Sequence, residues 1–315
     1  MTKKVEEIVA KIQEMVGDGD KVSGFDSFKN NRSGKDVGFS IYKNGKDFGP
    51  VMYLSVREIA EGNVDELAER VVHDLEDSEV DESAVSSIDA MSKDYILQNV
   101  VYRLIGQKTN EKLLTECPYK PFCDMALVYY VKISESRDNY MSFRVRNEHV
   151  DGFRITPEEL DEAAVRNTTA EGISFHSVTD MNRDMMLLRI AGRIEEAEAL
   201  IRGPRIPAKY DVAIEDADIC GGRMYSLTNH RQLNGAAMVA LPGVLKLIAD
   251  QADGDLVVFP GSIHEVNICR YTPQISRANC NRTVREANRH TVKPDEILSD
   301  HAYRYRRDLG MLTVL

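Results

Sequence analysis

A histidine and a glutamate, His264 and Glu265, stand side by side in the apolar segment FPGSIHEVNIC. In zinc proteases such a pair opens an HExxH motif on a helix, where two histidines one turn apart bind the same zinc ion. The position one turn after His264 holds Ile268, so the second histidine is absent. β-Branched residues in the segment favour a strand, and neighbours on a strand point to opposite faces. We therefore predict a strand over 263–269 in which His264 faces the core, Glu265 faces the other way, and no zinc is bound.

A second hint of catalysis comes from polar residues near the expected ends of strands. These are Asn229 after MYSLT, Ser262 and His264 before the next strand, and Asp300. Loops at strand ends are where many enzymes place functional side chains. Ser262 lacks the GxSxG elbow of hydrolases, and the sequence holds no P-loop, GxGxxG or kinase signature. The residues leave open a small hydrolase or transferase around Asn229, Ser262 and His264, and they predict no cofactor and no metal ion.

Arginines give the predicted helix at 274–290 a basic face. Arg282 and Arg289 form one row along it, and residues 277–307 hold eight Lys or Arg against four acids. Such an excess can bind a phosphate backbone. An Arg-rich helix can equally pair with an acidic surface of its own chain or of a partner. We expect the second, with nucleic acid as the less favoured partner.

The negative charge of the chain is concentrated in one stretch. Of 315 residues, 51 are acidic and 40 are Lys or Arg, a net charge of −11. The stretch from Glu58 to Asp94 holds 13 acids and two bases, so it carries this whole excess and the remainder is neutral. A solvated helix face and loop explain such a stretch better than mimicry of DNA. Its helix, predicted over 64–75, offers the basic helix a counter-charge within the same molecule.

Cysteine spacing and hydropathy favour the cytoplasm. The five cysteines are scattered and no CxxC occurs, so we expect neither a disulfide framework nor a zinc ribbon. No apolar run reaches the roughly 20 residues of a membrane span. The start, MTKKVEEIVAKIQ, alternates charged and aliphatic residues, unlike a signal peptide. We predict a cytosolic protein without a membrane partner.

Helices and strands are expected in an irregular order. Asn44-Gly45 lies between the apolar runs 37–42 and 51–54 and predicts a β-hairpin, because both residues tolerate positive φ. Thr156-Pro157 with Glu159 predicts a helix start through a capping box. The other expected elements are helices over 184–201 and 274–290 and strands over 96–105, 125–133, 142–146 and 236–241 (AAMVAL). Without regular βαβ order, the sequence predicts an α+β fold of mixed, mainly antiparallel sheets with packed helices.

The chain is long enough for two lobes. We predict an N-terminal α+β domain over 1–150 and a C-terminal α+β domain over 151–315. Within the second, residues 203–222 are punctuated by Pro and Gly and lack periodicity. We expect them to form an exposed, irregular excursion.

Several stretches together resemble a known family. They are FKNNRSGKDVGFSIY, GPVMYL, NEKLLTECPYKPFCDMALVY, LDEAAVRNT, MYSLTNHRQLNGAA, SIHEV and ILSDHAYRY, in family order from about Lys29 to Tyr305. Through them the chain is similar to the bacterial domain-of-unknown-function family fifty-six eighty-eight, common in gut Clostridia. Its C-terminal half is also similar to a second uncharacterised family, from bacilli. The chain departs from the usual pattern at Gly261, Ser226 and Ala287. The resemblance brings no activity, and because members often lie in variable or mobile genomic regions, it implies an accessory role.

Without a strong catalytic motif, the residues favour a non-catalytic binding or interaction protein, with the hydrolase or transferase as the alternative. We expect a protein partner or self-association. The candidate binding residues are Asn229, Ser262, His264, Glu265, Arg282, Arg289 and Asp300.

Overall fold

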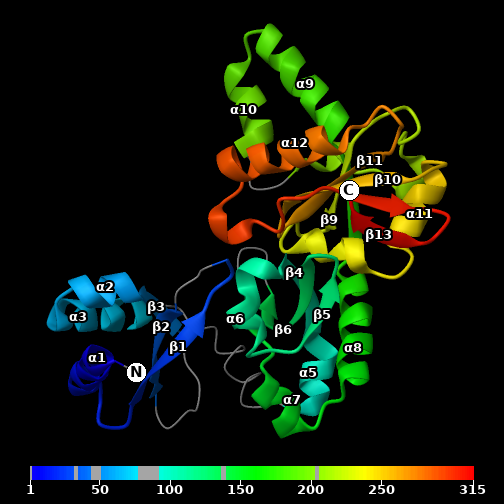
Figure 1. Cartoon of the computed structure of the whole chain (residues 1–315). Helices are drawn as coiled ribbons and strands as arrows, with labels where there is room; N and C mark the ends of the chain where they lie inside the picture. The colour runs from blue at the N-terminus through cyan, green and yellow to red at the C-terminus, as the bar shows by residue number, and fades with distance from the viewer. Residues whose placement is uncertain (1, 32–34, 44–50, 77–91, 136–139, 203–205) are drawn as a thin grey trace.

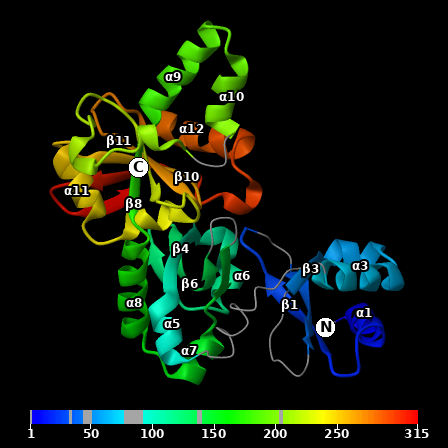
Figure 2. The ribbon, with the colours of Figure 1, turned by 180° about the vertical axis from the view of Figure 1, so that it is seen from behind.

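The computed structural model contains three sheets, each with helices packed against it (Figures 1 and 2). It describes residues 2–31, 35–43, 51–76, 92–135, 140–202 and 206–315. The named strands of this part of the chain pair with one another antiparallel throughout. The α+β class with mainly antiparallel sheets, predicted from the irregular order of elements, is confirmed.

The N-terminal sheet has three strands in the order β1-β2-β3. Its strands and helices are α1 (Lys3–Met15), β1 (Lys21–Phe28), β2 (Lys35–Tyr42), β3 (Val51–Ser55), α2 (Val56–Glu61) and α3 (Val64–Glu76). Apolar residues recur every third or fourth position of α1, so Val5, Ile8 and Ile12 face the sheet. The predicted pairing of β2 with β3 is confirmed, whereas the Asn-Gly turn lies outside the described residues.

The middle sheet pairs its strands in the order β4-β6-β5, with β7 also on β6. Its elements are α5 (Lys93–Asn99), β4 (Val100–Gly106), α6 (Glu111–Leu114), β5 (Tyr119–Phe122), β6 (Met125–Glu135), β7 (Tyr140–Arg144), α7 (Asn147–Phe153) and α8 (Pro157–Ala170). Helix α8 begins with the predicted capping box of Thr156 and Glu159. The strand predicted over 96–105 starts too early, because Ser92 caps a short helix through Asn99.

The C-terminal sheet has six strands in the order β13-β12-β10-β11-β9-β8. The strands are β8 (Ile173–Ser177), β9 (Tyr225–Asn229), β10 (Leu256–Ser262), β11 (Glu265–Arg270), β12 (Tyr303–Arg306) and β13 (Met311–Val314). Its helices are α9 (Val178–Ile190), α10 (Ile194–Arg202), α11 (Val244–Gln251) and α12 (Arg277–His290). Helix α12 matches the basic helix that the sequence predicted over 274–290.

Two predicted elements of this part are wrong. The single helix over 184–201 is a helical hairpin, because the chain leaves α9 at Ala191 and turns through Gly192 at φ +75°, a conformation that glycine tolerates. The strand predicted over AAMVAL is a 3-10 helix, Gly235–Ala240. All its residues up to Val239 are buried, so a continuous apolar run did not distinguish strand from helix.

The strand predicted over 263–269 is also wrong at its start. Pro260 and Gly261 belong to β10, and Ile263 and His264 form the turn of a β10–β11 hairpin. Strand β11 begins only at Glu265. His264 is therefore a turn residue rather than an inward-facing strand residue.

Most described residues of the excursion predicted over 203–222 are exposed, and a few apolar ones are buried. From residue 206 onward it consists of loops and two 3-10 turns, Ala208–Tyr210 and Ile214–Asp216. Tyr210, Ile214 and Ile219 are buried in it. Pro and Gly remove the periodicity without preventing apolar side chains from packing on the sheet.

Two large apolar cores divide the three sheets into two groups. One lies between α1, α3 and the N-terminal sheet and includes Ile8, Phe39 and Val71. The other is shared by the middle and C-terminal sheets, from Ile96 to Tyr305. The boundary predicted at residue 150 falls within α7 and along this shared core.

Candidate functional site

One face of the C-terminal sheet is polar where β8, β9 and β11 lie side by side. Every second residue of these strands points to this side of the sheet. We call this side the polar face, and its residues are Ser174, His176, Ser226, Thr228, Glu265 and Asn267. In the strand register Ser226 stands opposite both His176 and Asn267. Intervening residues such as Phe175 and Leu227 belong to the shared core, because successive strand residues point to opposite sides. The sheet thus has one apolar face and one face rich in hydrogen-bonding groups.

His176 is almost fully enclosed, with 2% of its surface exposed. Gln232 Nε2 donates to His176 Nε2 over 3.0 Å, which leaves the ring proton on Nδ1. Nδ1 faces Asp211 Oδ1 at 3.7 Å, beyond hydrogen-bond range, and has no other partner among the described residues. Burial lowers the pKa of His176, and the charge of Asp211 opposes this only in part. The imidazole is held in its neutral form.

Ser174 completes a Ser-His-Asp set around this histidine. Its Oγ lies 2.8 Å from His176 Nε2 and donates to Asp211 Oδ2 over 3.0 Å. In a hydrolase triad the serine stays open to substrate and the aspartate contacts only the histidine. Ser174 is buried and contacts both groups, so this set fixes strand β8 to the loop at Asp211.

The predicted pair His264–Glu265 serves different neighbours. His264 Nδ1 accepts a hydrogen bond from the backbone N–H of Asn234 over 3.0 Å, and its Nε2 lies 3.5 Å from Glu296 Oε1. Ser262 Oγ donates to Glu265 Oε1 over 3.1 Å and accepts from the backbone N–H of His264. Burial raises the pKa of Glu265, because the charged form loses its hydration. The Ser262 hydroxyl contacts a carboxylate rather than an imidazole, which is not a nucleophile–base arrangement.

The side chains of Asn229 and Asp300 bond other neighbours. The amide of Asn229 donates to Glu171 Oε2 and to the carbonyl of Leu233 and accepts from the Leu233 N–H, so it clamps the loop after β9. Asp300 accepts a hydrogen bond from Asn288 near the end of α12. Gly235 packs against both the backbone N of Asn229 and the carbonyl of His264, so Asn229 lies beside the group of Ser262, His264 and Glu265, whereas Asp300 bonds α12.

The arginines of α12 point to solvent. Arg282 and Arg289 are exposed, and Arg282 donates to the neighbouring amide of Asn279. No ion pair within the described residues joins either arginine to the acidic helix α3, which lies in another part of the molecule (Figure 1). The acids of that helix instead meet cations such as Lys11, at 3.2 Å from Asp65. Helix α3 therefore does not supply the counter-charge that the sequence predicted for α12, and the acidic loop after it, residues 77–91, lies outside the described residues.

Helices α9 and α10 form an arm that projects from the C-terminal sheet (Figures 1 and 2). None of the residues of α9 is buried. Four large apolar side chains near the turn of the arm are exposed: Met186 (63%), Leu187 (58%), Ile190 (74%) and Ile194 (49%). We call these four residues the tip. Exposed apolar side chains gathered on one element make it a candidate contact surface.

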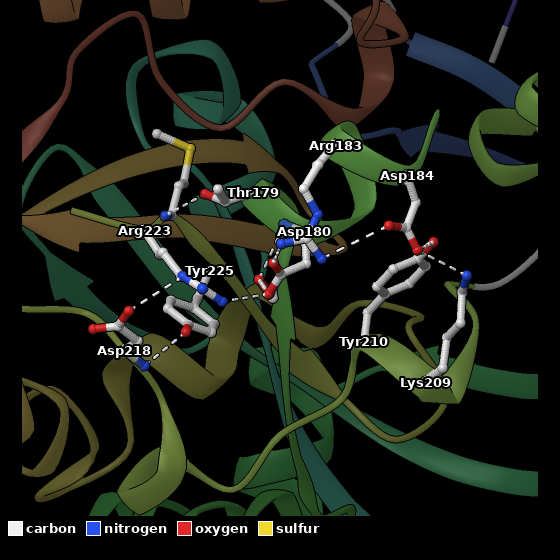
Figure 3. A network of polar contacts seen from close by, with 11 residues as sticks. Thr179, Asp180, Arg183, Asp184, Lys209, Tyr210, Asp218, Arg223 and Tyr225 are labelled. Atoms are coloured by element: carbon white, nitrogen blue, oxygen red, sulfur yellow. Dashed lines mark hydrogen bonds and ion pairs between the residues drawn. The ribbon is translucent and has the colours of Figure 1, made fainter. Parts of the chain in front are cut away.

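The base of the arm is held by a chain of charged groups (Figure 3). Asp180 accepts from Arg223 Nη1 over 2.8 Å and lies 2.9 Å from Arg183 Nη1. One turn further, Asp184 accepts from Lys209 Nζ over 3.1 Å and from the hydroxyl of Tyr210 over 3.2 Å. The hydrogen bond from Lys209 lowers the pKa of Asp184, because it favours the ionised carboxylate.

Further contacts at the same place involve the backbone. Thr179 Oγ1 accepts from the backbone N–H of Met224, and the backbone N–H of Asp218 donates to the hydroxyl of Tyr225. Arg223 also lies 3.3 Å from Asp218. The arm is therefore anchored to the strand and loop that lie beneath it, while its tip is left uncovered by the described residues.

A second histidine cluster joins the middle and C-terminal sheets. Asp124, in the β5–β6 turn, accepts from Ser299 Oγ and bonds His301 Nδ1, each over 2.9 Å, and also accepts from the hydroxyl of Tyr303. Burial acts to raise the pKa of Asp124, but the three hydrogen bonds outweigh it and lower that pKa. An ionised carboxylate with this many donors is a structural link between the sheets.

Two chemical possibilities can be checked directly on the described part of the chain. It contains no group of three or more His, Cys, Asp or Glu side chains that could hold a metal ion. None of its helices is long and apolar enough to cross a membrane.

The whole chain matches one family model. Residues 2–307 match the model described as Family of unknown function (DUF5688). The chain belongs to this family. No curated protein and no solved structure matches the chain significantly. Membership confirms the resemblance seen in the sequence and assigns no activity.

Stretches that carried the resemblance meet where the sheets join. Asn31, from FKNNRSG, donates through its backbone N–H to Asn110 Oδ1 over 2.8 Å and through Nδ2 to the carbonyl of Ile297 over 2.6 Å. It adopts φ +56°, which asparagine tolerates better than most residues. Asn110 begins NEKLLTECPYKPF, and Ile297 begins ILSDHAYRY. These contacts fix the end of β1 to both other sheets.

Sequence reasoning missed both histidine clusters, although a signal was present. Ser299, His301 and Tyr303 are spaced two apart, as are Ser174 and His176, and such spacing places side chains on one face of an extended chain. A search of the sequence for polar residues spaced two apart would have grouped these side chains. Asp124 and Asp211 could not be found in this way, because each comes from a distant loop.

Proposed function

We propose that the chain is a non-catalytic binding protein that acts through contact with another protein chain, and that the arm is its contact surface. The tip is the observation that carries the proposal. It exposes four large apolar side chains on an element whose base is tied down by ion pairs. Exposed apolar area on a held element favours binding, because little conformational entropy is lost when a partner docks.

The occupant that best fits the tip is a second copy of this chain. Helices α9 and α10 pack against each other, so the outer side of this two-helix hairpin has no helix to cover it among the described residues. A second hairpin packed against it would complete a four-helix arrangement. Exposed charges of both signs, Arg189 and Glu195, flank the tip. A two-fold contact can place each sign opposite the other, as isologous interfaces require.

The patch is small, which sets the expected strength. Each partner contributes four apolar side chains, so the area buried in the contact lies at the low end of specific interfaces. We therefore expect a dissociation constant that is roughly micromolar. Such a dimer forms at high protein concentration and dissociates at low concentration. This behaviour suits an accessory protein that assembles only when it accumulates.

Sedimentation velocity over about 1 to 100 μM protein tests this function, because that range brackets the expected constant. The wild type should shift from monomer to dimer, and Ile190→Asp should remain monomeric, because a charge would be buried without a partner. Leu309→Asp is the matched control, since Leu309 is an exposed aliphatic residue (54%) outside the arm. A wild type that stays monomeric throughout, or a dimer that Ile190→Asp leaves intact, would contradict the proposal.

The cytoplasm is the compartment that we propose for this role. The five cysteines are all free, which fits a reducing environment. Cys117 and Cys280 are buried among apolar side chains, and burial raises the pKa of each thiol. They fit a role in packing rather than in redox chemistry.

Nucleic-acid binding is a second candidate, favoured by the exposed arginines of α12. Arg282 and Arg289 have no acidic partner among the described residues, so phosphate could approach them. If they bind phosphate, affinity must fall steeply with salt, and replacing both by Gln should flatten the slope by roughly two. A gel-shift series with mixed DNA and RNA across salt measures this. We expect no such binding, because the chain outside residues 277–307 carries no excess of positive charge.

A hydrolase or transferase around Asn229, Ser262 and His264 has less support. The side chains of Ser262 and Asn229 are bonded to their surroundings, and Ser262 Oγ bonds the Glu265 carboxylate and the His264 backbone N–H rather than the His264 imidazole. A small esterase substrate turned over by the wild type, and not by Ser262→Ala, would restore that alternative.

A further inference from the structure

A cavity of about 400 Å³ lies between α12 and the polar face of the C-terminal sheet, away from the tip of the arm. Phe259 and Asn267 line it from the sheet, and Cys280, Val284 and Ala287 line it from one side of α12. This volume lies within the range of small-molecule sites. The arginines of α12 do not line it.

The lining is wholly uncharged. Besides apolar side chains it contains the amide of Asn267 and, toward solvent, the polar groups of Gln274, Ser276 and Asn279. An ionised ligand would lose hydration there without meeting an opposite charge. The cavity therefore favours a neutral molecule with a largely apolar body.

Asn267 lines the cavity, and Ser226 stands behind it on the neighbouring strand β9. Ser226 Oγ is buried and has no hydrogen-bond partner among the described residues. Asn267, which stands opposite it in the strand register, makes no side-chain hydrogen bond within the described part of the chain. Buried polar groups are almost always paired, and leaving one unpaired is unfavourable. Ser226 is such an exception, and the half-buried Asn267 amide, which faces the cavity, is the group that a ligand can satisfy.

The chemistry of these groups defines the ligand. A carboxamide presents a donor and an acceptor side by side, and it pairs with a heteroaromatic edge that offers the complementary two, as asparagine does with adenine. Phe259 supplies an aromatic surface for such a ring. We infer that the cavity binds an uncharged nitrogen heteroaromatic ring, of the nucleobase or nicotinamide kind, through the Asn267 amide. This site is independent of the arm and goes beyond the protein contact proposed above.

Adenine, uracil and nicotinamide are suitable probes, with benzoate as a charged ring of similar size. Binding is measured by saturation-transfer NMR and by titration of the full-length protein. At least one neutral probe should bind with a roughly submillimolar dissociation constant, and benzoate should not. Asn267→Leu, similar in shape but unable to pair, should weaken that binding by about tenfold or more.

Ala287→Phe provides a second variant, because it fills the cavity from α12 and leaves Asn267 in place. It should abolish binding, and it decides the matter if Asn267→Leu does not fold. Ile190→Asp, on the arm, should bind the probes like the wild type. If none of the three neutral probes binds at about 10 mM, a concentration high enough to detect even weak specific sites, the inference is overturned. Binding that Ala287→Phe leaves unchanged would also overturn it.

Discussion

Helices α8 and α9 are nearly equal in length and are joined by the single strand β8, yet their surroundings are opposite. Helix α8 has only two Val, Leu, Ile or Met residues, and it buries Leu160, Ala163, Ala164 and Thr168. Helix α9 has seven such residues and buries none. Apolar content therefore does not decide burial here. What decides it is whether a sheet lies opposite the helix, and the apolar residues of α9 without one remain available to a partner.

Truncating the buried side of α8 should give the largest effect on stability. Leu160→Ala removes a side chain that is 1% exposed in the shared core, and we expect unfolding to become easier by about 2–5 kcal/mol. Urea denaturation followed by circular dichroism measures the loss. A change below about 1 kcal/mol would mean that α8 is not held as described, because core truncations rarely cost so little.

Breaking the anchor of α9 should cost less and act locally. Asp180→Ala removes the acceptor shared by Arg223 and Ser177, and it leaves the Arg223 guanidinium with Asp218 alone. We expect a loss of about 1–3 kcal/mol. Hydrogen exchange should quicken in α9 and stay unchanged in α8. Glu196→Gln, in an exposed pair with Arg193, is the control and should change neither helix. Uniform quickening in both helices would show that the arm is not a separate unit.

The strand between the two helices gives a pH-dependent effect. Burial lowers the pKa of His176, so below the ordinary histidine pKa of about 6.5 the unfolded chain binds a proton that the native state does not. Stability should then fall as pH decreases from 7 to 5. The slope of the wild type should exceed that of His176→Gln by up to about 1.4 kcal/mol per pH unit. Denaturation at matched pH values measures the difference, and equal slopes would mean that His176 titrates normally in the fold.

The smallest effect on stability is expected at the tip. Leu187→Ala and Met186→Gln change exposed side chains, so the monomer should shift by less than about 0.5 kcal/mol. The measurement is made at a concentration low enough to keep the wild type monomeric. A loss comparable to that of Leu160→Ala would place the tip in a core and remove the contrast between the helices.

Sequence alone predicted the regular parts well and the junctions poorly. The α8 capping box and the basic helix at α12 were found because local spacing determines them. The break of α9 from α10 at Gly192 and the 3-10 helix at Gly235–Ala240 were missed, because apolar periodicity does not separate these alternatives. Of the candidate site, the closeness of Ser262 to His264 followed from nearness in the chain, whereas the bond between Ser262 and Glu265 was not predicted.

Contacts between distant segments were beyond reach. The pairing of His176 with Gln232, and of Asp124 with His301, joins residues far apart in sequence. The exposure of α9 was equally hidden, because its apolar residues read as a core helix. Their exposure depends on what lies opposite the helix, and that is a property of the tertiary fold.

Photo-crosslinking tests most directly whether the arm contacts a second copy of the chain. A photoreactive phenylalanine derivative is placed at Leu187 on α9, or at Leu247 on α11 as an exposed control (43%), and the products are mapped by mass spectrometry. At a protein concentration above the expected micromolar constant, Leu187 should link to peptides of α9 or α10 from another molecule, and Leu247 should not. Links from Leu187 that are no more frequent than those from Leu247, or that map to surfaces outside the arm, would contradict the account.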